Sequence, residues 1–356
     1  MAKSSHLLVI DRFDPVARLL FFKLGFGVLG VVVLQWVLGA VELLALPWNY
    51  IPIWNSIFLI AVMPIFWGYY ALTRHRIPRL HGCLKENKIL VDIEIDQFRV
   101  FVNKFKASYS SLVISVIALV CGSLYVIFTQ FVLWKNQPPP FPTSGLHAVY
   151  SHIWVFFSIY VSTLTVIREL IAIYWLNYFF RHFSIQIHPL HPDGAGGLGF
   201  IGNHYLGLTL LIIAIGYWLS FLNFLTPLTE GQPLNLNFEV IVGWILFLIA
   251  APFSFFVPLW SAHLAMKRNK MAKLQVISEQ YDSDIEHIQS NLNLDVTVLE
   301  KRTKKATELY EIYQMTNKIH PTWPYSAQTL RRFSLSALLP VIQVGIMVYQ
   351  VINSPP

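Results

Sequence analysis

Long apolar segments alternate with shorter polar segments along the whole 356-residue chain. A transmembrane helix needs about 20 consecutive, mostly apolar residues to cross the hydrocarbon core of a bilayer. Seven segments reach that length, and they predict an all-α, polytopic membrane protein with seven transmembrane helices. The predicted helices cover residues 19–46, 53–72, 110–134, 148–177, 205–225, 240–263 and 333–352.

The first predicted helix has a clear start signal. Asp14 is a favourable N-cap residue, and Pro15 follows it at the first helical position, where proline is well tolerated. The apolar run after this signal is longer than the h-region of a cleaved signal peptide, which has about 7–15 residues. We therefore expect a transmembrane helix here and not a signal peptide.

The composition agrees with a membrane protein. Only 13% of the residues are charged and 55% are hydrophobic, whereas a soluble domain has about 25% charged residues. The mean hydropathy of +0.53 points in the same direction. These values exclude an ordinary soluble globular domain.

The Lys and Arg residues lie almost entirely on one side of the predicted membrane. Of 26 such residues, 23 lie in the N-terminal segment and in the loops on its side, and Lys135 is the single one in the opposite loops. Because cytosolic loops carry an excess of Lys and Arg, the N-terminus is predicted to be cytosolic and the C-terminus outside. The same distribution explains the net charge of +7. We therefore expect membrane lipid as a partner, and no nucleic acid.

The pattern divides the chain into three regions. Residues 1–264 are predicted to form a six-helix transmembrane region with cytosolic loops at 73–109 and 181–204. Residues 265–332 are predicted to form a cytosolic helical hairpin, and residues 333–356 the last transmembrane helix and a tail.

Two amphipathic helical faces predict the hairpin. The first face continues the sixth helix, and the second follows a polar break at residues 291–295. Short helices bury little surface by themselves, so the hairpin packs either on its own protomer or on neighbouring subunits. The apolar positions are Leu274, Ile277, Tyr281, Ile285, Ile288 and Leu292 on the first helix, and Leu299, Ala306, Leu309, Tyr313 and Met315 on the second.

Local signals set further boundaries. Pro321 and Pro324 are expected to stop the second hairpin helix, and Ser326 is expected to cap the last helix. Residues 89–96 alternate apolar with mostly acidic side chains, which is the period of a strand. A single strand is only marginally stable, so this segment is either irregular or paired with another subunit.

One cytosolic segment, the glycine-rich loop 188–204, has the residue types of a functional site. His188, His191 and Asp193 place two imidazoles and a carboxylate within six residues. Two His and one carboxylate form the ligand set of an open divalent-metal site. The loop is therefore a candidate metal site.

The same loop has two other interpretations. Gly194, Gly196 and Gly197 could allow backbone N–H groups to approach an anion at the start of the fifth helix. Alternatively, the glycines only supply the positive φ that tight turns need. The chain has no His-Glu-x-x-His, Gly-x-Ser-x-Gly or Walker A signature. Catalysis is therefore expected nowhere else, and no cofactor is expected apart from a divalent metal at this loop.

Charged residues within the predicted helices are few. Arg168 and Glu169 lie in the fourth helix, which is longer than the hydrocarbon core is thick. We therefore expect them near the cytosolic interface, with a buried proton or ion relay as the alternative. The scarcity of buried charge argues against a proton-coupled secondary transporter.

The last helix carries a polar stripe. Ser336, Gln343 and Gln350 repeat every seven residues, and Met347 lies on the same face. Such a stripe either packs against another helix or lines a water-filled pore. Arg331 and Arg332 precede this helix, where they either anchor it at the membrane surface or ring the mouth of a pore.

This layout resembles that of the insect chemoreceptor channels, although no motif is shared. Those channels have seven spans, a cytosolic N-terminus, cytosolic helices that assemble the tetramer, and a last helix that lines the pore. The resemblance implies a homo-oligomeric channel for small ions in a cell membrane, either inner or plasma membrane. The alternatives are a membrane-embedded enzyme or metal-dependent sensor at the glycine-rich loop, and a signalling protein whose hairpin docks a partner.

Overall fold

The computed structural model describes residues 13–23, 25–45, 63–90, 95–128, 145–230, 238–290 and 296–353. These residues form an all-helical fold, as predicted. The elements are α2 (Pro15–Ala17), a π-helical turn η1 (Arg18–Lys23), α3 (Val28–Ala45), α5 (Met63–Glu86), α6 (Ile95–Tyr109), α7 (Leu112–Phe128), α8 (Gly145–His182), α9 (Gly199–Glu230), α10 (Phe238–Ser290), α11 (Val296–Ile319) and α12 (Ala327–Asn353).

Four helical segments are long and apolar enough to cross a membrane, which indicates a membrane protein. A shorter apolar helix covers Val28–Val41. Residues 46–62 and 129–144, which include parts of the second and third predicted spans, lie outside the described residues. The count of seven spans and their orientation stay predictions. The four segments are Asp96–Phe128, His152–His182, Gly199–Gly216 and Phe247–Ser290.

The first predicted helix is interrupted, so the expectation of one helix from Asp14 is wrong. After α2 and η1 the backbone leaves the helix at Gly25, where φ is +67°, and α3 begins at Val28. Glycine adopts this left-handed conformation without steric cost. The backbone N–H of Phe26 donates to the carbonyl of Leu20 across the break, at 2.9 Å. The break lets α2 and α3 pack in different directions.

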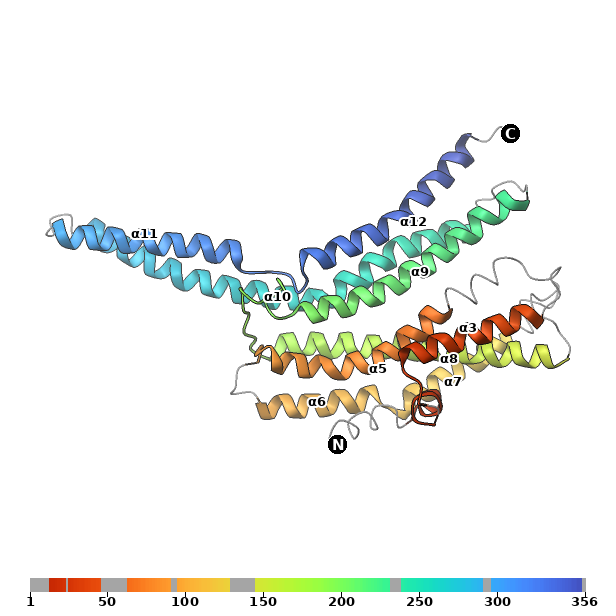
Figure 1. Ribbon diagram of the computed structural model, residues 1–356. Coiled ribbons are helices and arrows are strands. Elements are labelled where there is room, and N and C mark those ends of the chain that lie inside the picture. Colours follow the sequence, from red (N-terminus) through yellow and green to blue (C-terminus); the bar gives the residue numbers. More distant parts are fainter. Residues whose placement is uncertain are drawn as a thin grey trace.

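The helices form two groups that meet along α9 (Figure 1). In one group α9 packs against α10 and α12, and in the other α5 and α8 pack with α3, α6 and α7. Contacts of α9 with α5, and of α10 with α8, join the groups. Helix α9 approaches α10 closely at Gly216, where an added Cβ would collide with the Phe247 ring. Small residues allow such close packing of membrane helices.

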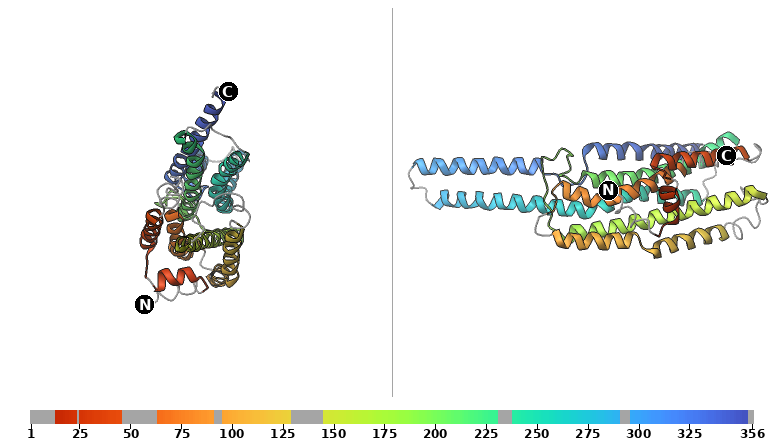
Figure 2. Two further views of the ribbon diagram at one scale, coloured as in Figure 1. Left: turned by 90° about the vertical axis from the view of Figure 1, so that its right-hand side faces the viewer. Right: turned by 60° about the horizontal axis from the view of Figure 1, so that its bottom comes forward.

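The predicted hairpin is present. Helix α10 runs without interruption through Pro252 and Pro258 and, at 53 residues, extends for about 80 Å. With α11 it projects beyond the other helices in both Figure 1 and the right view of Figure 2. Leu274 and Leu309 are buried, as their spacing predicts, whereas Met315 is 60% exposed.

The boundaries of the hairpin follow the predicted signals. Helix α11 ends at Ile319, just before Pro321. The Ser326 hydroxyl accepts from the backbone N–H of Thr329 at 3.2 Å, which is the predicted cap of α12. Residues 291–295 lie outside the described residues.

The predicted loop 73–109 is mostly helical, because α5 continues to Glu86 and α6 covers Ile95–Tyr109. In the strand-like segment 89–96, Leu90 forms an antiparallel bridge with Ile185, residues 91–94 lie outside the described residues, and Ile95 begins α6. The backbone N–H of Gln186 donates to Ile89 at 2.8 Å beside this bridge. The bridge holds the glycine-rich loop against the end of α5.

Candidate functional site

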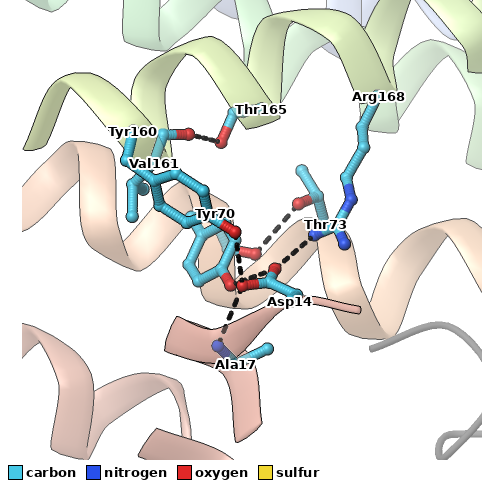
Figure 3. Close-up of polar contacts among 8 residues, drawn as sticks. All are labelled: Asp14, Ala17, Tyr70, Thr73, Tyr160, Val161, Thr165 and Arg168. Carbon is cyan, nitrogen blue, oxygen red and sulfur yellow. Dashed lines mark hydrogen bonds and ion pairs between the residues drawn. The ribbon is translucent and has the colours of Figure 1, made fainter. Parts of the chain in front are cut away.

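Asp14 lies buried at the start of α2, and its carboxylate accepts hydrogen bonds from three groups (Figure 3). The backbone N–H of Ala17 donates to Oδ1 at 3.1 Å, which is the N-cap bond predicted from the sequence. The hydroxyl of Tyr160 donates to the same oxygen at 3.1 Å, and that of Tyr70 donates to Oδ2 at 2.6 Å. Asp14 therefore joins the first helical turn to α5 and α8.

Arg168 on α8 balances the charge of Asp14. Its Nη1 lies 3.1 Å from Asp14 Oδ2, and the two side chains are 4% and 0% exposed. The guanidinium also lies over the Tyr109 ring, 5.1 Å from the ring centre, which is the geometry of a cation–π contact. An ion pair buried this deeply is destabilising to break, because the remaining charge has no water to solvate it.

Glu169 begins a second buried cluster beside the first. The Tyr69 hydroxyl of α5 donates to Oε1 at 2.9 Å, and His204 Nε2 of α9 lies 3.1 Å from Oε2. Both Glu169 and His204 are almost fully buried. His204 Nδ1 and the Tyr205 hydroxyl are buried as well and have no hydrogen-bond partner among the described residues.

These contacts correct the expectations for charge within the helices. Arg168 and Glu169 are each 3% exposed, so both side chains are buried within the protein, and their position relative to the membrane interface stays a prediction. Arg74 is also buried, and its guanidinium lies 4.1 Å from the centre of the Phe21 ring. The expectation that the apolar part is nearly free of buried charge is therefore wrong. The argument against a proton-coupled secondary transporter depended on that expectation, and it no longer holds.

The glycine-rich loop is organised around the Asp193 carboxylate. Oδ1 accepts from the backbone N–H groups of Ala195 at 2.9 Å and Gly197 at 3.1 Å, and Oδ2 accepts from Gly199 at 2.8 Å. Gly199 is the first residue of α9, so Asp193 caps that helix. The chain thus places its own carboxylate where the helix dipole favours a negative charge.

The loop glycines adopt the conformation that the tight-turn interpretation predicts. Gly194, Gly196 and Gly197 have φ values of +63°, +68° and +93°. The backbone N–H of Gly194 donates to the His191 carbonyl at 3.1 Å, so this group and that of Gly197 are both engaged within the loop. Contact with an external anion stays a prediction.

The predicted metal ligands have contacts of their own. His191 Nδ1 lies 2.8 Å from Asp193 Oδ1, and His188 Nε2 lies 3.2 Å from the Lys88 carbonyl oxygen. Among the described residues, the structure groups no three His, Cys, Asp or Glu side chains so that they could hold a metal ion. The metal site stays a prediction, and its carboxylate already serves as a helix cap.

The predicted pore-lining residues lie on α12. Ser336 is half-buried, whereas Arg331 and Arg332 are exposed. The side chains of Gln343, Met347 and Gln350 lie outside the described part of the structure. Ser336, Gln343 and Gln350 lie seven residues apart on one continuous helix, as the sequence predicts.

No family model matches this chain, and the comparisons with curated proteins and with solved structures found no match either. The sequence did not predict the buried clusters around Asp14 and Glu169 as candidate sites. Asp14 was identified as a cap and Arg168 as an intramembrane charge, but nothing in the sequence pairs residues so far apart.

We predict that Arg168→Met lowers the free energy of unfolding by about 3–5 kcal/mol, because it leaves the Asp14 carboxylate buried without its cation. The double variant Asp14→Asn, Arg168→Met should be less destabilised than the sum of the single variants by at least about 1 kcal/mol. Denaturant titration in detergent micelles, followed by tryptophan fluorescence, measures both values.

Asp96 and Arg99 on α6 provide the control pair for this cycle. They form an ion pair at 3.6 Å with side chains 94% and 74% exposed. The corresponding substitutions, Asp96→Asn and Arg99→Met, should have a coupling free energy of less than about 0.5 kcal/mol. Equal coupling energies for the two pairs would contradict a larger contribution of the buried Asp14–Arg168 pair to stability.

We also predict that Asp193→Ala lowers the free energy of unfolding by about 2–3 kcal/mol, because three backbone N–H groups lose a charged acceptor. Asp96→Ala, at an exposed position, is the control and should stay within about 0.5 kcal/mol of the wild type. Denaturant titration followed by tryptophan fluorescence measures the free energy of unfolding of both variants. A loss at Asp193 no larger than at Asp96 would refute the capping role.

The same carboxylate makes stability depend on pH. Burial by itself raises the pKa of Asp193, but the hydrogen bonds from Ala195, Gly199, Gly197 and His191 outweigh it and hold the pKa below the ordinary 3.8. A folded-state pKa below the unfolded value means that the stabilisation is present above about pH 4 and is lost as the pH falls further. Between about pH 5 and pH 3, Asp193→Asn should lose less stability than the wild type.

Proposed function

We propose that this protein is a homo-oligomeric membrane channel for small ions. In this proposal α12 surrounds the pore and the α10–α11 hairpin assembles the subunits. The observation that carries the proposal is the apolar surface that the hairpin leaves exposed outside the apolar helix bundle. The hairpin is followed in the chain by α12, so assembly of the hairpins would bring the α12 helices together.

The exposed surface on α11 is a continuous stripe. Ile312, Met315 and Ile319 follow one another at intervals of three and four residues, so they share one face of the helix. They are 49%, 60% and 40% exposed. The face that packs on α10 is a different one, which carries the buried Ala306 and Leu309. A charged helical hairpin with such a stripe suits contact with a second copy of the chain.

Helix α12 lies at the edge of the fold, which favours a role at a subunit interface. It packs mainly on α9 and, less extensively, on α10. Leu335, Leu338, Ile342, Ile346 and Tyr349 share one exposed apolar face. Ser336, Gln343 and Gln350 repeat on a different face, and in the proposed oligomer this face lines the pore.

The proposal includes seven spans with a cytosolic N-terminus and an outer C-terminus. The one-sided distribution of Lys and Arg in the sequence supports this orientation. It places the hairpin in the cytosol and Arg331 and Arg332 at the inner mouth of the pore. Rings of arginine favour anions, so we propose a preference for anions over cations.

We predict that the purified protein conducts ions in planar bilayers, and that Gln343→Leu lowers its single-channel conductance at least about twofold, because the substitution removes a polar group from the pore lining. Arg331→Glu should shift the reversal potential in a salt gradient towards cation selectivity, because it inverts the charge at the pore mouth. Both quantities come from the same recordings.

Two variants control for these effects. Gln328→Leu lies on the same helix but off the seven-residue repeat, and Lys301→Glu inverts a charge on the hairpin. Both should leave conductance and selectivity unchanged. A wild-type protein that does not conduct, or Gln343 and Arg331 variants that behave as the wild type, would reject α12 as the pore helix.

We further predict that Met315→Lys dissociates the oligomer, because it places a charge in the apolar stripe that the subunits share. Thr307→Lys, at an exposed position on the same helix, should leave the oligomer intact. Light scattering coupled to size-exclusion chromatography in detergent gives the protein mass. A wild type that is monomeric, or a Met315 variant of wild-type mass, would exclude the hairpin as the assembly element.

A further inference from the structure

A surface groove runs between α8 and α10 at the C-terminal end of α8. Its first part has a volume of about 580 Å³, and its second part, of about 380 Å³, adjoins the first at Arg181 and His182. The two helices that form it are labelled in Figure 1. The two parts have different chemistry, which determines the ligand that fits.

The first part of the groove is apolar and aromatic. Tyr174 and Tyr178 of α8 face Phe256, Val257 and Trp260 of α10 across it. Tyr174 is 63% exposed and Trp260 is 54% exposed. These helices belong to the segments that are long and apolar enough to cross a membrane. Tyr and Trp are enriched where such helices leave the hydrocarbon for the headgroup region.

The second part of the groove is polar and basic. Arg181, His182 and Arg268 line it together with Ser184 and Asn269. Arg268 is held in place because its Nη2 donates to the Phe180 carbonyl at 3.2 Å. His182 stacks on Tyr178 at 3.9 Å between ring centres, and its Nδ1 lies 2.9 Å from the Tyr178 carbonyl oxygen. These contacts orient two of the three basic groups.

The charged side chains that line the groove are all basic. None of the described residues that line either part is Asp or Glu. Two guanidiniums with no carboxylate beside them in the groove favour an anion, and Arg binds phosphate oxygens through two parallel hydrogen bonds. A soluble anion would use only the basic part. A ligand that fills both parts has an anionic phosphate head and an apolar tail.

We propose that this groove binds an anionic phospholipid. The phosphate contacts Arg181 and Arg268, with His182 as a further hydrogen-bonding group. The acyl chains lie against Tyr174, Trp260 and their neighbours. This inference depends on the membrane location of α8 and α10 and not on channel activity, so it stands or falls independently of the proposed function.

The test uses the full-length protein, delipidated in a neutral detergent and titrated with lipids that carry brominated acyl chains. Bromine quenches nearby tryptophans, and the chain has 11 of them. The difference in quenching between the wild type and Trp260→Phe therefore isolates Trp260. We expect brominated phosphatidylglycerol to quench Trp260 at a concentration at least about fivefold lower than brominated phosphatidylcholine.

Arg181→Gln should raise the phosphatidylglycerol concentration needed about fivefold, which corresponds to about 1 kcal/mol, and should leave phosphatidylcholine unchanged. The unchanged binding of phosphatidylcholine shows that the variant is folded. Lys267→Gln is the matched control, because Lys267 is an exposed base next to Arg268 that does not line the groove. It should stay within about twofold of the wild type.

Three results would overturn the proposal. The first is equal quenching by the two lipids, which would mean that the groove does not discriminate between an anionic and a zwitterionic headgroup. The second is an equal loss for Arg181→Gln and Lys267→Gln, which would mean a general attraction of charge. The third is displacement of phosphatidylglycerol by inorganic phosphate at a similar concentration, which would make the groove a site for the free anion.

Discussion

The ion pair between Asp14 and Arg168 is the constraint on which the apolar half of the structure depends. A charge buried among apolar helices needs a partner, because its desolvation costs several kcal/mol. Arg168 lies in the C-terminal half of α8, so the N-terminal segment has to enter the bundle and bring Asp14 to it. That requirement explains why α2 is short and why the chain turns at Gly25 before α3 can pack on α5. It also explains why Tyr70 and Tyr160 point their hydroxyls at one carboxylate.

A second carboxylate organises the other end of the bundle in the same way. Asp193 gathers the N–H groups of its own loop and thereby sets the first residue of α9 at Gly199. His204 follows about one and a half turns later, where it meets Glu169 of α8. The position of the cap therefore determines the register in which α9 packs on α8. Asp193 therefore affects the buried cluster through the position of α9.

The sequence predicts features that depend on neighbouring residues, and it misses those that depend on distant ones. The caps at Asp14 and Ser326, the stop before Pro321 and the hairpin are local signals, and the structure contains all of them. The pairing of Asp14 with Arg168 follows from helix packing, which a single sequence does not encode in any local pattern. The exposure of Met315 was missed for a related reason. Helical spacing identifies an apolar face, but it does not say whether the same protomer covers that face.

Helix α10 connects these features mechanically, because it continues without a break from the apolar bundle to the tip of the hairpin. It carries Trp260 and Arg268 of the groove, and beyond them the buried Leu274 of the hairpin. Beyond Pro258 the part of α10 that carries Arg268 and continues to Ser290 contains no proline, so no proline interrupts its backbone hydrogen bonds. In the proposed channel, a lipid bound in the groove would therefore contact the same rigid element that assembles the subunits. Lipid composition would then act on assembly through α10, without any contact between the lipid and the pore helix.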